Sequence, residues 1–109
     1  KASRFEAWSG STLVGLIAAY CNDQENRIAY ITSVSVLKGW TGKGIAACLM
    51  SRCIKNMKTL GIRQICLQVA SENMAAIRLY EKNGFVSGDD NVPFVTMNLN
   101  FKNGEEYEQ

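Results

Sequence analysis

Apolar stretches separated by turn-forming residues divide the first third of the chain into three predicted strands. Residues 5–8 and 13–20 are rich in apolar side chains and are separated by a short Ser/Gly/Thr segment, so they predict a β-hairpin. Gly15 lies inside the second stretch and indicates a β-bulge. After a polar loop, residues 27–37 are rich in β-branched side chains and alternate in polarity, which predicts a third strand.

The middle of the chain changes from a period of two to a helical period. Apolar residues between positions 45 and 60 recur at spacings of four and three, which predicts an amphipathic helix that ends at Gly61. The face expected to be buried comprises Ile45, Leu49, Cys53, Met57 and Leu60. Residues 62–69 then predict a strand.

A second helix and a last strand complete the predicted fold. The helix is expected to start near Asn73, with Ser71 as its cap, and to end where Asn83 and Gly84 supply a left-handed turn. Residues 94–101 predict the final strand. The resulting order is three strands, helix, strand, helix, strand. It predicts one α/β domain over residues 1–109, with a mixed, mostly antiparallel central sheet and packed helices.

Composition and charge exclude several classes of function. The formal net charge of +2 gives no basis for expecting nucleic-acid or membrane binding. The chain has no histidine, which removes every mechanism that needs an imidazole base. Residues 102–109 carry three glutamates and little apolar content, so we expect a flexible tail.

The cysteines favour structural thiols over a metal site. Cys21, Cys48, Cys53 and Cys66 form no CxxC pair, and without histidine a zinc site has almost no support. We therefore expect no metal, and we interpret the cysteines as buried free thiols of a protein in the reducing cytoplasm.

A glycine-rich turn between the third strand and the first helix is a candidate anion site. Gly42, Lys43 and Gly44 lead directly into the helix, whose first N–H groups lack intrahelical partners and lie at the positive end of the helix dipole. Such a helix start binds phosphate readily, and Lys43 could add a charged contact. Taken alone, the glycines are equally typical of a tight structural turn.

The second helix carries three residues on one face. Asn73, Ala76 and Tyr80 follow one another at spacings of three and four. Taken alone, this pattern favours Tyr80 as a half-buried core aromatic with its hydroxyl at the surface.

Two segments of the sequence match extended sequence patterns. Residues 73–85, NMAAIRLYEKNGF, resemble the pattern N-x-x-A-x-x-L-Y-x-x-x-G-F. Residues 36–46, VLKGWTGKGIA, are similar to V-x-P-x-[YF]-[RQ]-G-x-G-[IV]-[GA]. Both patterns, in this order along the chain, resemble motifs of the GNAT (GCN5-related) N-acetyltransferase family, and the resemblance covers roughly residues 5–101. It implies the acyl-CoA N-acyltransferase (GNAT) fold.

The resemblance also implies roles for individual residues. The turn would hold the pyrophosphate of coenzyme A, the preceding strand and the helix asparagine would contact its pantetheine arm, and Tyr80 would lie near the thioester sulfur as general acid to the leaving thiolate. The implied cofactor-binding residues are Val34, Ser35, Val36, Thr41, Gly42, Lys43, Gly44, Ile45, Ala46 and Asn73. A tyrosine, with an ordinary pKa of about 10, stays protonated at neutral pH and can supply the proton.

The implied reaction moves an acetyl group from acetyl-CoA to a primary amine by direct attack. The acceptor is a small-molecule or a protein amine, and a homodimer is compatible with the family. A catalytically weak acyl-CoA-binding domain of the same fold is the alternative, and an interaction module whose glycine turn is only structural is a third hypothesis.

Departures from the family pattern give weight to the alternative. Thr41 occupies a position that is usually Arg or Gln, and Lys38 replaces a common proline. Thr32 falls where many members carry a Glu that helps to deprotonate the amine. Asp89 and Asp90 are the nearest replacement carboxylates in the sequence, although their position in a loop favours two solvated acids over a catalytic base.

The start of the chain departs from the family as well. Only four residues precede the predicted hairpin, and the first of them is not Met. We therefore expect a chain truncated at its N-terminus, without the strand and helices with which members of this family begin. The apolar sheet face that those helices cover would then be exposed or covered by self-association.

Overall fold

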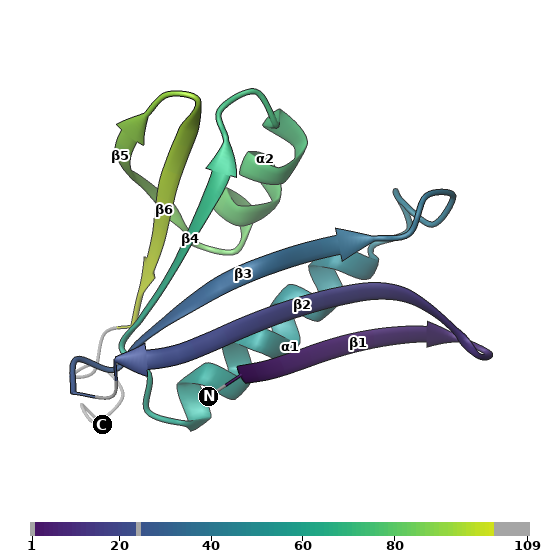
Figure 1. Ribbon diagram of the computed structural model, residues 1–109, viewed down its shortest axis with the longest axis horizontal. Coiled ribbons are helices and arrows are strands. Elements are labelled where there is room, and N and C mark those ends of the chain that lie inside the picture. The colour runs from purple at the N-terminus through teal and green to yellow at the C-terminus, as the bar shows by residue number, and fades with distance from the viewer. Residues whose placement is uncertain (1, 24, 102–109) are drawn as a thin grey trace.

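The computed structural model describes residues 2–23 and 25–101 and shows a six-stranded sheet with two helices (Figure 1). The order of the strands across the sheet is β1-β2-β3-β4-β6-β5. In chain order the elements are β1 (Ala2–Ser9), β2 (Thr12–Asp23), β3 (Ile28–Val36), α1 (Ile45–Thr59), β4 (Gln64–Ala70), α2 (Met74–Lys82), β5 (Val86–Asn91) and β6 (Phe94–Asn100). Only the β3–β4 pair is parallel among these strands, so the prediction of a mixed, mostly antiparallel sheet is confirmed.

One strand was not predicted. β5 has the sequence Val-Ser-Gly-Asp-Asp-Asn, which is polar and poor in β-forming residues, and it pairs antiparallel with β6 at the edge of the sheet. An edge strand needs only one partner and no buried face, so tertiary pairing alone holds this segment in the sheet. The predicted tail at 102–109 lies outside the described residues.

The bulge predicted near Gly15 is present in the hairpin of β1 and β2. Ala7 pairs with Gly15 and Trp8 with Leu13, so Val14 is the additional residue. A Cβ atom at Gly15 would lie 2.6 Å from Cγ2 of Ile45, the first residue of α1. The missing side chain therefore lets α1 begin directly against β2.

The parallel pair of β3 and β4 separates halfway along its length. Paired positions run from Ile28 with Gln64 to Ile31 with Leu67, whereas β3 continues to Val36 and β4 to Ala70. Figure 1 shows the two strands diverging from this point. We call this divergence the fork.

A second bulge lies at the fork. Ala19 pairs with Ile31 and Ala18 with Ser33, so Thr32 is the additional residue of β3. The Thr32 hydroxyl donates a 3.4 Å hydrogen bond to the carbonyl of Ala18. Because a bulge bends its strand and increases the local twist, it turns β3 away from β4 where their pairing stops.

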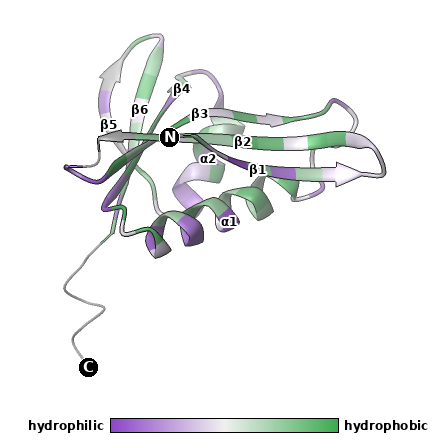
Figure 2. Cartoon of the chain, turned by 60° about the horizontal axis from the view of Figure 1, so that its bottom comes forward, coloured by the Kyte–Doolittle hydropathy of each residue, from purple (hydrophilic) through white to green (hydrophobic). Residues whose placement is uncertain are grey.

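Both helices cover the same face of the sheet (Figure 2). The inward residues of β4, which are Ile65, Leu67 and Val69, are buried. The buried face of α1 comprises Leu49, Met50, Cys53 and Met57, whereas Leu60 is 58% exposed and lies after the end of the helix. The prediction that Leu60 belongs to the buried face is therefore wrong.

The cysteines are free, as predicted, but they are not all buried. Cys53 is buried in the core, Cys21 and Cys66 are half-buried, and Cys48 is exposed. Cys48 lies on the outer side of α1, five residues before Cys53, so the helical period places it away from the sheet. Burial raises the pKa of the Cys53 thiol to about 11, which keeps that thiol protonated.

The other face of the sheet carries exposed aromatic and aliphatic side chains. Trp8 is 56% exposed, Leu37 45%, and Tyr20 and Tyr30 are each 42% exposed. We call it the open face. In residues 2–23 and 25–101, no helix is both long and apolar enough to cross a membrane.

Candidate active site at the fork of the sheet

The glycine turn connects the end of β3 to α1 with backbone conformations that favour glycine. Gly39, Gly42 and Gly44 have φ angles of 92°, 77° and 80°. Gly44 is the N-cap of α1, and no side chain caps this end of the helix. A Cβ atom at Gly42 or Gly44 would have no neighbour within 4 Å, and the first turn of α1 contains no acidic residue. The amino end of α1 is therefore an open and electrically positive site.

The amino end of α2 is closed by a side chain. Oδ1 of Asn73 accepts a 3.2 Å hydrogen bond from the backbone N–H of Ala76, so Asn73 is the N-cap. The prediction that Ser71 caps this helix is wrong, because the Ser71 hydroxyl instead donates a 3.1 Å hydrogen bond to the carbonyl of Pro93. The predicted left-handed turn at the other end is present, with Gly84 at a φ of 98°.

A cleft of about 210 Å³ occupies the fork on the helix-covered face. It brings together three of the predicted site residues, which are Val34 from β3, Tyr80 from α2 and Asn73, the N-cap of α2. Its remaining lining comes from the two diverging strands and consists of Ile31, Thr32, Ser33, Leu67, Gln68, Val69 and Ala70. Past Ile31 and Leu67, no register pair within the described residues links β3 to β4, so backbone groups of both strands face the cleft.

Tyr80 is held firmly at the wall of this cleft. The side chain is 6% exposed, and its ring packs on Phe85 at a centroid distance of 5.9 Å and an interplanar angle of 56°. The backbone N–H of Phe85 donates a 3.0 Å hydrogen bond to the carbonyl of Tyr80. Burial raises the pKa of the Tyr80 hydroxyl above its ordinary value, so the phenol is protonated at neutral pH.

A second cavity of about 510 Å³ lies on the open face of the fork. Four residues, Ile31, Thr32, Leu67 and Gln68, line both this cavity and the cleft. The remaining residues of the lining are Tyr30, Cys66 and Thr96. The two hollows therefore meet at the fork and open on opposite faces of the sheet.

Sequence reasoning missed this open-face cavity. Its residues come from three strands that are distant in sequence, and no motif marks them. Only the strand order, which places β3 beside β4 and β4 beside β6, assembles them.

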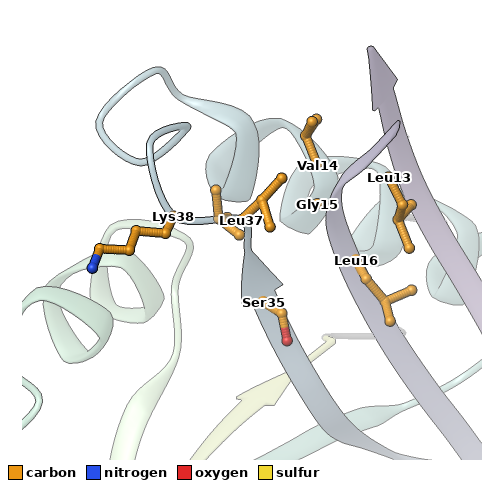
Figure 3. A pocket seen from close by; sticks show the side chains of 8 residues that line it. Leu13, Val14, Gly15, Leu16, Ser35, Leu37 and Lys38 are labelled. Carbon is orange, nitrogen blue, oxygen red and sulfur yellow. The ribbon is translucent and has the colours of Figure 1, made fainter. Parts of the chain in front are cut away.

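Ser35 and Val36 lie apart from the cleft. They line a third hollow of about 340 Å³ between β2 and β3, together with Leu13, Leu16, Leu37 and neighbouring residues. Figure 3 shows the Lys38 side chain extending away from the leucines of this hollow.

Asp89, one of the two predicted replacement carboxylates, lies on a strand that is not adjacent to the fork. Asp89 is exposed on β5, and β6 separates that strand from β4. With strands spaced about 4.8 Å apart, β5 lies about 10 Å from β4. Asp90 belongs to the same strand, but its side chain lies outside the described part of the chain. This position does not support Asp89 as a base that touches the acceptor.

No metal centre is present among the residues that the structure describes. Within them, no group of three or more His, Cys, Asp or Glu side chains could hold a metal ion.

Comparison with known proteins identifies the family to which this chain belongs. The profile of the acetyltransferase (GNAT) family matches residues 2–85. The chain therefore belongs to the GNAT acetyltransferase family.

Relatives and solved structures agree with this assignment. The chain is 32% identical over 83 residues to the N-alpha-acetyltransferase MAK3 of Arabidopsis thaliana, covering 75% of this chain and 44% of that protein. It is 29% identical over 87 residues to the mycothiol acetyltransferase of Corynebacterium efficiens, covering 80% and 29%. The structure of the PaiA N-acetyltransferase from Thermoplasma acidophilum in complex with coenzyme A superposes with a TM-score of 0.83 at 26% identity, over 92% of this chain and 61% of that one.

The chain spans only part of these proteins. It covers less than half of the two curated relatives and about three fifths of the solved structure.

Proposed function

We propose that the chain binds acetyl-CoA on the helix side of the fork and transfers the acetyl group to an amine that enters from the open face. The observation that carries the proposal is the pair of hollows that share Ile31, Thr32, Leu67 and Gln68. A direct transfer needs two reactants to meet at one point, and two cavities that join at a gap in the sheet provide such a point.

The open end of α1 suits the pyrophosphate of the cofactor. Backbone N–H groups of residues 42–46 lie at the positive end of a 15-residue helix, and glycines leave room for a phosphate to approach. Thr41 and Lys43 are exposed beside them. From this point the pantetheine arm would run along residues 34–36 into the fork, past Asn73, where the unpaired backbone of β3 can form hydrogen bonds with its amides.

Tyr80 would serve as the general acid. An amine nitrogen attacks the thioester carbonyl, the carbon–sulfur bond breaks, and the departing thiolate takes the phenolic proton. The proton that the amine nitrogen loses on becoming an amide then restores the Tyr80 phenol, by way of solvent. The negative charge that develops on the carbonyl oxygen can be stabilised by backbone N–H groups at the bulge of Thr32. The buried, protonated state of Tyr80 at the cleft wall supports this role.

A peptide α-amine is the acceptor that best fits the open-face cavity. Tyr30, Thr32, Cys66, Gln68 and Thr96 are uncharged side chains, so an amine that arrives already neutral is favoured. With a pKa of about 7.8, roughly a third of an α-amine is neutral at pH 7.5, compared with about one part in a thousand of a lysine side chain. The similarity to an N-alpha-acetyltransferase supports the same acceptor.

Calorimetric titration with acetyl-CoA, followed by an acetylation assay with peptides, tests the proposal. We expect saturable binding of acetyl-CoA and acetylation of a free peptide N-terminus in preference to a lysine in an N-terminally blocked peptide. Absence of acetyl-CoA binding at millimolar concentration would contradict the cofactor site. Equal acetylation of both peptides would contradict the proposal that a peptide α-amine is the preferred acceptor.

The variant Tyr80→Phe tests the acid. Turnover should fall about 10²-fold because the proton donor is lost, whereas the dissociation constant of acetyl-CoA should stay nearly the same. Tyr20→Phe is the matched control, since Tyr20 is an exposed tyrosine outside both cavities. An unchanged turnover number in Tyr80→Phe would remove this residue from the mechanism.

A weakly active or inactive acyl-CoA-binding domain is the second candidate. Thr41 and Thr32 stand where the family pattern has residues that grip the cofactor and help to deprotonate the amine. Tight acetyl-CoA binding without acetylation of any amine would favour this candidate.

A further inference from the structure

We propose that Tyr30 forms the wall against which the first side chain of the acceptor peptide packs, so that Tyr30 selects peptides with a large apolar first residue. The inference rests on the proposed function, because it assumes an acceptor amine at the open face of the fork. It adds a specificity-determining residue to that site.

The open-face cavity has a polar end and an apolar end. Thr32 and Gln68 lie at the fork itself, and Thr96 is the direct partner of Gln68 on the neighbouring strand. Tyr30 and Cys66 are directly paired across β3 and β4, one step back toward the closed part of the sheet. The hydroxyl and amide groups at the fork suit an amine and a peptide backbone, whereas the ring and the thiol suit an apolar side chain.

Part of the Tyr30 side chain is exposed on this wall and is therefore available to a peptide side chain. Its side chain is 42% exposed and contributes to the lining of the cavity. Burial raises the pKa of the neighbouring Cys66 thiol, so the thiol stays protonated and uncharged, and its sulfur donates a 3.4 Å hydrogen bond to Oε1 of Gln64. A side chain laid over this pair would remove apolar surface from water without covering a charged group.

Covalent geometry brings the first side chain into the open-face cavity that Tyr30 lines. The side chain is attached to the carbon that bears the amine, so it must enter the cavity when the amine reaches the fork. Tyr30 lies about 7 Å along the strand from Thr32. The cavity, at about 510 Å³, is much larger than the roughly 30 Å³ of a water molecule and can hold more than an amine.

Tyr20 provides a matched control. It is the direct partner of Tyr30 on β2 and has the same exposed fraction of 42%, but the cavity lining does not include it. Removing either ring takes a similar amount of exposed aromatic surface from the open face. Only removal of the Tyr30 ring should change the choice of acceptor.

The test compares two peptides that differ only in their first residue, Leu or Gly, under kcat/KM conditions with saturating acetyl-CoA. The wild-type chain should prefer the Leu peptide. Tyr30→Ala should lower kcat/KM about tenfold for the Leu peptide and less than about twofold for the Gly peptide. This is the size of effect expected when the apolar contact between the Tyr30 ring and the Leu side chain is lost. Tyr30→Phe keeps the ring and should keep the preference, and Tyr20→Ala should leave both values unchanged.

Three results would overturn the inference. One is an equal loss for both peptides in Tyr30→Ala, the second is loss of the preference in Tyr30→Phe, and the third is the same effect from Tyr20→Ala. Failure of the wild-type chain to acetylate either peptide would contradict the proposed function instead. The wall would then be tested by titrating the Leu peptide into the CoA-loaded chain. Binding weakened only by Tyr30→Ala would support it, and no binding or equal binding would overturn it.

Discussion

The two helices begin on either side of the fork, and their amino ends are built in opposite ways. α1 begins at Gly44, where no side chain occupies the free N–H groups, whereas α2 begins at Asn73, whose side chain accepts a hydrogen bond from the N–H of Ala76. Neither helix has an acidic residue in its first turn.

This difference separates the proposed binding site at α1 from a purely structural helix start at α2. A side-chain cap stabilises a helix by satisfying its first N–H groups, and it also removes them from ligands. The nine-residue α2 is short enough to need such a cap, whereas the 15-residue α1 is held by its buried face of Leu49, Met50, Cys53 and Met57. α1 can therefore keep its amino end open for an anion.

Placing a carboxylate at the open end should have the largest effect. Gly44→Glu puts a negative charge where the pyrophosphate is proposed to bind, and two like charges 4 Å apart repel by about 4 kcal/mol at an effective dielectric constant of about 20. We expect acetyl-CoA affinity, measured by calorimetry, to fall about a hundredfold or more.

Gly10→Glu controls for backbone strain in that experiment. Gly10 also has a positive φ, of 61°, and a Cβ atom at this position would likewise have no neighbour within 4 Å, but Gly10 lies in the turn between β1 and β2. Its substitution should leave acetyl-CoA affinity unchanged. Equal losses of acetyl-CoA affinity in the two variants would show that Gly44→Glu acts through backbone strain and not through its negative charge.

Adding a cation at the open end should strengthen binding by a smaller factor. Thr41→Arg restores the residue type common in the family and supplies a guanidinium that can form paired hydrogen bonds with a phosphate. We expect acetyl-CoA to bind about three- to tenfold more tightly, with the gain decreasing as salt is raised. A gain that is independent of ionic strength would argue against a phosphate contact.

Removing the cap of α2 should have the smallest effect on the cofactor. Asn73→Ala should lower the free energy of unfolding by about 1 kcal/mol, measured by urea denaturation, because the N–H of Ala76 loses its acceptor. Asn73→Ser keeps a capping oxygen and should recover most of that stability. If both variants weaken acetyl-CoA binding equally although Ser restores stability, Asn73 contacts the cofactor in addition to capping the helix.

The sequence predicts correctly those helices and strands that form because of their own local residue pattern. The period of four and three around Leu49, Cys53 and Met57 identified α1, and the glycine at position 84 identified the end of α2. β5 was missed because its pairing with β6, and not its polar sequence, makes it a strand. The prediction of Ser71 as the cap of α2 fails because its hydroxyl donates a hydrogen bond to the carbonyl of Pro93, a contact between distant segments that the sequence does not show.

The residues of the candidate site also fall into two groups, those that the sequence predicts and those that only the fold brings together. The glycine turn and Tyr80 lie in continuous motifs, so the sequence identified them and the fold places Tyr80 at the cleft. The open-face cavity depends on residues near positions 30, 66 and 96, which become neighbours only through the strand order β3-β4-β6. Hydrophobic periodicity indicates which face of a strand is buried, but it does not indicate which strands are adjacent.

The proposed cofactor site is expected to depend on Gly15, a residue that would not itself touch the cofactor. Any side chain at this position would meet Cγ2 of Ile45 at 2.6 Å and Cδ1 of Leu49 at 3.1 Å, and would therefore push the first turn of α1 away from the sheet. The bulged hairpin thus sets the depth at which the open helix end lies beside the fork. In a mutational scan scored by acetyl-CoA affinity, Gly15 would rank with the residues of the glycine turn, although about 30 positions of sequence and the whole of β3 separate them.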